Sequence, residues 1–162
     1  MLQQLANLGS FIGGVGVLLT VVYLAIQIRQ NTESNRGASY QAAVAAISEW
    51  SRQVGLDRSA ARIVSAGTQD PGALGEEEAA QFRYLIVSLM RNFENIHYQY
   101  CSGAISPDAW EGWSHRILAF SDQPGVIQWW QEHETAYSSK FRELISSSKL
   151  RSVEKAEARS DA

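Results

Sequence analysis

The chain has 162 residues, of which 45% are hydrophobic and 19% charged, and its formal net charge is −3. Beyond Arg29 about 130 residues remain, which is enough for one domain with a core of its own. Charges nearly balance along this part, and no Lys/Arg cluster occurs before the C-terminal tail. The electrostatic footprint of a nucleic-acid-binding protein is therefore absent, and we expect no nucleic-acid partner.

The first part of the chain is uncharged over residues 2–28, and the first charged side chain is Arg29. About 20 apolar helical residues cross a hydrocarbon core of roughly 30 Å. The pattern predicts a transmembrane anchor over residues 1–30, with the lipid bilayer as its partner. A cleaved signal peptide is disfavoured, because the first residues lack Lys and Arg and a cut after Ala25 would place bulky Tyr23 at the −3 position.

The arginines predict the orientation of this anchor. Arg29 and Arg36 follow the apolar run, whereas no Lys or Arg precedes it. The positive-inside bias then places the N-terminus outside and the C-terminal domain in the cytoplasm. The single cysteine, Cys101, agrees with a reducing compartment.

Small residues recur along one face of the predicted anchor. Gly9, Gly13, Gly16 and Thr20 are spaced by four, three and four positions, so they share one helical face. Such a stripe lets another helix approach closely. We predict that these residues bind a second transmembrane helix, either of another copy or of a membrane-complex subunit. The alternative is that glycine is simply common in membrane helices.

Helical periodicity continues through residues 31–147, and no convincing alternating strand occurs. We predict an all-α fold in which the anchor precedes a bundle domain of about four to six helices over residues 31–147. Three helices are predicted over 31–54, 58–65 and 76–101. Two more are predicted to begin at Pro107 and at Pro124, and a short last helix is predicted around 141–145. Residues 67–72 are predicted to form a turn, and 148–162 a polar, disordered tail.

The sharpest enzymatic hypothesis rests on Glu94 and His97, a Glu-x-x-His pair on one helical face. Two such pairs and two further glutamates build a di-metal site in helical bundles. The chain lacks a second pair, so we expect no metal and no cofactor, and the two side chains more simply join a polar layer. Cys101, one turn from His97, is expected to be partly buried and inert. No P-loop or nucleophile elbow occurs, so the sequence leans away from an enzyme.

Four of the five tryptophans lie in the last predicted helices, at positions 110, 113, 129 and 130. Adjacent Trp129 and Trp130 cannot point the same way along a helix, so one of them is expected to be partly exposed. The simplest interpretation is a ring of core residues with one member at the rim. The functional interpretations are a partner-binding surface that includes Trp129 and Trp130 or a contact with the membrane interface.

Several segments together resemble a family of small, uncharacterised bacterial single-pass membrane proteins. These segments are LANLG at 5–9, YLAIQIRQNT at 23–32, NFENIHYQY at 92–100, WEGW at 110–113, and PGV at 124–126 leading into Trp129 and Trp130. The resemblance implies an N-terminal transmembrane helix, an all-helical cytoplasmic domain and a place in the cell inner membrane. It implies no activity, ligand or catalytic residue.

The predicted function is that of a membrane-anchored accessory or scaffolding protein, which acts by protein–protein association and is not catalytic. One alternative is a tethered domain that senses a small ligand in a pocket lined by Tyr98, Tyr100 and the tryptophans. The other is a metal-dependent enzyme that uses Glu94 and His97. The identity of any partner and the oligomeric state are left open by the sequence.

Overall fold

A computed structural model describes the backbone of residues 2–147 and the side chains of residues 14–147. The elements are α1 (Leu2–Leu56), α2 (Arg58–Gln69), the 3₁₀ turn η1 (Pro71–Ala73), α3 (Glu76–Cys101), α4 (Pro107–Ser121), α5 (Pro124–His133) and the 3₁₀ turn η2 (Glu134–Ala136). A further helix covers 139–147. No residue between 2 and 147 is in a strand, so the predicted all-α class is confirmed. The predicted disordered tail, 148–162, lies outside the described residues.

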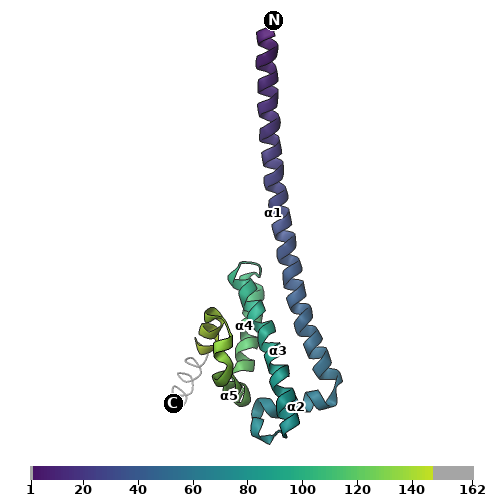
Figure 1. The fold of residues 1–162 in the computed structure, drawn as a ribbon, viewed down its shortest axis with the longest axis vertical. Coiled ribbons are helices and arrows are strands. Elements are labelled where there is room, and N and C mark those ends of the chain that lie inside the picture. The colour runs from purple at the N-terminus through teal and green to yellow at the C-terminus, as the bar shows by residue number, and fades with distance from the viewer. Residues whose placement is uncertain (1, 148–162) are drawn as a thin grey trace. The chain divides into compact units, whose positions relative to one another are not determined.

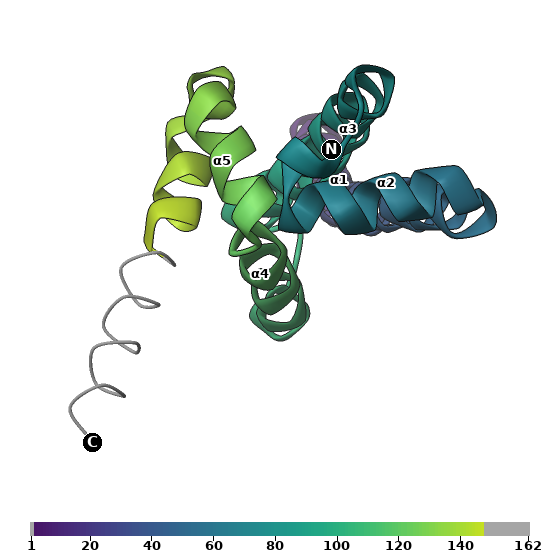
Figure 2. The ribbon, with the colours of Figure 1, turned by 90° about the horizontal axis from the view of Figure 1, so that it is seen from below.

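The chain divides into two compact units at Ala38 and Ser39, and α1 contributes residues to both. The first unit is the N-terminal part of α1. The second contains residues 39–56 of α1 and all the later helices, which Figures 1 and 2 show gathered into one bundle.

The predicted membrane anchor is contradicted. In the part of the chain that the structure describes, no helix is long and apolar enough to cross a membrane. This finding overturns the predicted transmembrane helix, the single-pass topology and the inner-membrane location with its outside N-terminus.

Local sequence signals set most helix ends in the second unit. The Asp57 carboxylate accepts hydrogen bonds from the N–H groups of Ser59 and Ala60 and so caps α2. Ser106 caps α4, and Pro107 takes its first position, where a missing N–H costs nothing. After α3 the chain reverses at Gly103, whose φ of 73° is a backbone conformation that glycine adopts freely.

Helix α2 is longer than its sequence pattern indicated, because it continues to Gln69 and so includes residues 67–69 of the predicted turn. The hydroxyl of Thr68 donates to the carbonyl oxygen of Ser65, 3.2 Å away. Gly67 is buried against the ring of Phe82, where a side-chain carbon would come within 2.5 Å of the ring. Tertiary packing therefore extends this helix through residues that favour turns in isolation.

The core of the bundle is apolar and aromatic. Its buried members come from every helix of the second unit: Ala43, Ile47, Ile63, Phe82, Ile86, Leu89, Met90, Phe93, Ile96, Ile105, Ile117, Trp129, Trp130, Tyr137, Phe141 and Ile145. Residues 39–56 of α1 are joined to α3 and α4 by two side-chain hydrogen bonds in addition to their apolar contacts. The indole N–H of Trp50 donates to the carbonyl oxygen of Leu85 at 3.0 Å, and that of Trp113 donates to the hydroxyl of Tyr40 at 3.2 Å.

Candidate functional site

Glu94 belongs to a polar link between α3 and the last helix. One oxygen of its carboxylate accepts a hydrogen bond from the backbone N–H of Ser138 at 2.7 Å, and the other contacts the Arg91 guanidinium at 2.6 Å. Arg91 also donates to the carbonyl oxygen of Ala136 at 2.9 Å. Because Ser138 directly precedes helix 139–147, Glu94 acts as an N-terminal cap supplied by a distant helix.

The charges and rings around this link shift two pKa values. Burial alone would raise the pKa of Glu94, but the Ser138 N–H and the Arg91 guanidinium outweigh it and hold the pKa below its usual value. The Arg91 guanidinium also lies 4.2 Å from the centre of the Tyr137 ring. Burial raises the pKa of Tyr137 to about 12, so its phenol stays protonated at neutral pH. In this link the negative charge of Glu94 is balanced by the positive charge of Arg91, and its role is to join α3 to the last helix.

The two metal-ligand candidates have different surroundings. Glu94 is engaged by Arg91 and Ser138, whereas the Nε2 atom of His97 lies 3.5 Å from the Sγ atom of Cys101. Among the described residues no group of three or more His, Cys, Asp or Glu side chains could hold a metal ion. Glu94 and His97 do lie on the same helix, but no third potential metal ligand lies with them among the described residues.

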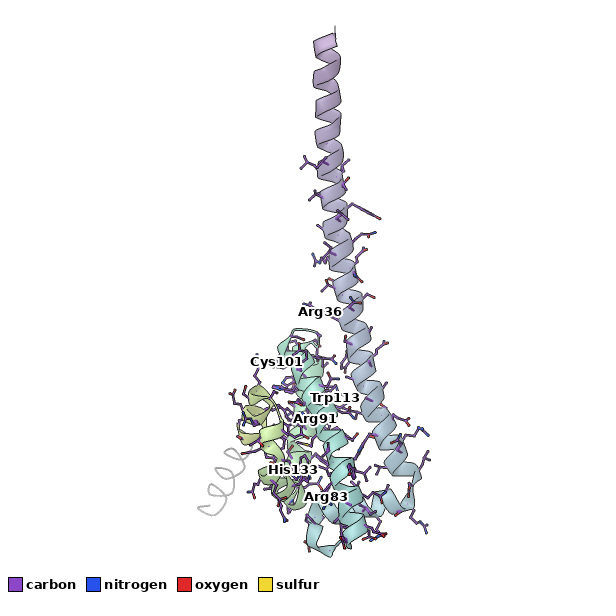
Figure 3. All side chains as sticks on the ribbon, in the orientation of Figure 1. Arg36, Arg83, Arg91, Cys101, Trp113 and His133 are labelled. Atoms are coloured by element: carbon purple, nitrogen blue, oxygen red, sulfur yellow. The ribbon has the colours of Figure 1, made fainter. Side chains whose placement is uncertain are left out.

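His97 and Cys101 open onto a cavity of about 440 Å³ between the C-terminal end of α3 and the start of helix 139–147. Its remaining lining comes from Tyr98, Ser102, Ser138, Ser139 and Lys140. His97 is 8% exposed and packs against the rings of Trp110 and Phe141. Cys101, labelled in Figure 3, is exposed, contrary to the expectation that it is partly buried.

The bundle also has a larger apolar groove of about 620 Å³. Its wall includes Ile47, Trp50, Val54, Val64, Leu89, Phe93, Ala119 and Phe120, and its polar members are Ser51, His115, Arg116 and Gln123. Arg116 takes part in none of the four ion pairs found between described residues. The sequence analysis did not single out this groove, because its wall comes from four helices and no local pattern marks it.

The tryptophan pair is not a surface feature of the bundle. Trp129 is 5% exposed and Trp130 is 1% exposed, so neither ring is presented to a partner, although one was expected at the rim. Trp129 stacks on His133 with 4.6 Å between ring centres, while Trp130 packs edge-on against Phe141. Of the residues expected to line a ligand pocket, Tyr98 borders the cavity beside Cys101, whereas Tyr100 stacks on Trp110.

Of the small-residue stripe, Gly16 and Thr20 lie within the part whose side chains are described, and Gly9 and Gly13 lie before it. The Thr20 hydroxyl donates to the Gly16 carbonyl oxygen at 2.8 Å. A side-chain carbon at position 16 would meet nothing within 4 Å. Within the part whose side chains are described, the stripe is therefore open beside Gly16.

The chain matches no known protein-family model, no curated protein sequence and no solved structure. The resemblance to a family of single-pass membrane proteins is therefore unsupported, and the absence of a membrane-spanning helix among the described residues contradicts it.

Proposed function

We propose that this protein acts by association, as a non-catalytic accessory or scaffolding subunit that binds an apolar helix of a second protein chain. The observation that supports it is the exposed apolar surface of α1 in the first unit. Nine large apolar side chains are at least half exposed there: Val17, Leu18, Leu19, Val21, Val22, Tyr23, Leu24, Ile26 and Ile28. A contiguous apolar surface of this kind marks an interaction site.

The nature of the occupant follows from the small residues on the same helix. Gly16 and Thr20 are one turn apart and leave room beside the backbone. A flat apolar molecule needs no such gap, whereas a second helix packs closely only where side chains are small, since interaxial distances of 8–10 Å depend on the residues at the contact. We therefore assign this face to a partner helix, whether from another copy or from another protein.

The test replaces a small residue by a large one at two matched positions of α1. Gly16→Ile should remove the species that associate with the full-length protein, measured by sedimentation for self-association and by pull-down with mass spectrometry for other chains. Gly37→Ile is the control. A side-chain carbon at position 37 of α1 also meets nothing within 4 Å, but its sequence neighbours are polar, so no packing face is expected there. If Gly16→Ile retains the same copies or partners as wild type, the packing face does not exist.

A second candidate function is small-ligand binding in the apolar groove, favoured by its volume of about 620 Å³. Ligand pockets are mostly apolar, fall in the range of about 300–1,000 Å³ and carry a few polar groups that orient the ligand. Arg116 and His115 would attract the anionic head of an amphipathic molecule. Titration with decanoate tests this candidate, followed by the tryptophan fluorescence change that Trp50→Phe should remove. Binding should weaken in Arg116→Glu and persist in Arg62→Glu, whose arginine pairs with Glu78 away from the groove.

A further inference from the structure

The cavity beside Cys101 combines a nucleophile, a base and a cation that come from two different helices. Cys101 and His97 are one turn apart on α3, and Lys140 belongs to the first turn of helix 139–147. The thiol and the imidazole are within contact distance, with 3.5 Å between Sγ and Nε2. A cavity of about 440 Å³ gives a small molecule access to all three groups.

The imidazole is suited to accept the thiol proton. Burial, and then the nearby positive charge of Lys140, lower the pKa of His97, with Glu94 acting in the opposite direction. The ring is therefore neutral at neutral pH and has one unprotonated nitrogen. A neutral imidazole beside a thiol is the arrangement in which an adjacent general base activates a sulfur nucleophile.

The wall formed by helix 139–147 carries one positive charge, that of Lys140. Ser138 and Ser139 complete its lining, and Ser138 also bonds to the Glu94 carboxylate. Residues 139 and 140 begin the last helix, whose described part ends at 147. Because the Glu94 carboxylate already caps this end at the Ser138 N–H, the attraction for a further anion comes from the Lys140 ammonium group. A molecule with a carboxylate at this wall would place its other end over Cys101.

We propose that this cavity is a thiol-modification site that takes a small anionic disulfide and forms a mixed disulfide with Cys101. The Cys101 sulfur attacks one sulfur of the reagent, a new S–S bond forms and the reagent's S–S bond breaks. The thiol proton passes to His97 Nε2 and then to the departing sulfur, which leaves as a free thiol. The disulfide is the oxidant, so the exchange balances without another reactant. This site is independent of the association surface on α1.

The experiment uses the full-length reduced protein, whose single cysteine makes the intact mass an unambiguous readout. Oxidised glutathione is the anionic probe, cystamine is the cationic probe, and a short peptide with residues 99–104 reports the reactivity of an unfolded thiol. Relative to the peptide, the protein should prefer glutathione disulfide over cystamine by about fivefold, the factor that corresponds to one unit charge at about 4 Å in water.

Two variants separate the roles of the cation and the base. Lys140→Gln, at an exposed position, should abolish the preference, while Arg58→Gln, also exposed and outside the cavity, should keep it. His97→Gln should slow reaction with both probes by about tenfold or more, and circular dichroism checks that it remains folded. If His97→Gln unfolds, His97→Asn replaces it. Reaction at the peptide's rates with both probes, or variants that react like wild type, would overturn the proposal.

Discussion

Gly125 of α5 lies directly against the backbone of Gly67 in α2. A side-chain carbon at position 125 would overlap the Gly67 carbonyl oxygen and come within 3.0 Å of Pro71 Cδ. On its own side, Gly67 meets the ring of Phe82 in α3. These two glycines therefore allow α2, α3 and α5 to approach one another more closely than side chains would permit.

We expect Gly125→Ala to destabilise the bundle by about 1–3 kcal/mol or more, because the neighbour that must move is rigid backbone. Urea denaturation of the full-length protein measures the change. Gly112→Ala is the matched control, since position 112 lies inside α4 with nothing within 4 Å and alanine is the better helix former by about 0.5–1 kcal/mol. Equal effects of the two substitutions would show that the close approach at Gly125 is not required.

Glu94→Gln should cost about 0.5–2 kcal/mol, because it keeps the shape of the side chain but removes the charge that caps helix 139–147 and pairs with Arg91. The change in the free energy of unfolding at pH 7 measures it. Glu111→Gln, on the exposed face of α4, controls for the loss of a surface charge and should change stability little.

The same carboxylate gives the bundle a pH dependence of known sign. The pKa of Glu94 is lowered in the folded chain, so protonation favours the unfolded chain. Its stabilising contribution is complete above the ordinary value of 4.5 and is lost as the pH falls through the lower folded value. Thermal melts between pH 6 and pH 3 should therefore show a steeper decline for wild type than for Glu94→Gln. Parallel curves would mean that the cap does not persist in solution.

Trp50→Phe should destabilise the attachment of residues 39–56 to α3 by about 1 kcal/mol, since it removes the indole donor to the Leu85 carbonyl and part of the packed ring. The position of the thermal transition in far-ultraviolet circular dichroism reports the change. Tyr84→Phe, on a side chain that is 78% exposed, removes a polar group without a buried contact and should leave the transition in place.

The sequence was most informative where structure is local. Apolar spacing and caps predicted the helix over 76–101 and the starts at Pro107 and Pro124, because a helix end depends on a few neighbouring residues. It was misleading at Gly67, where turn propensity lost to packing against Phe82, and at Trp129 and Trp130, both of which the bundle buries. The apolar run before Arg29 predicted a membrane anchor that the described residues do not provide.

Glu94, His97 and Cys101 are visible in the sequence as neighbours on one helix, and their mutual spacing follows from 3.6 residues per turn. The residues that these three side chains contact outside α3 cannot be inferred from that spacing. Ser138 lies 44 positions after Glu94. Only the packing of helix 139–147 beside α3 turns a Glu-x-x-His pattern into a cap at Glu94 and a cavity at Cys101. The sequence by itself determined the helices and their faces, since these depend on short-range periodicity. Tertiary structure decided which faces meet, because that depends on side-chain volumes and distant contacts.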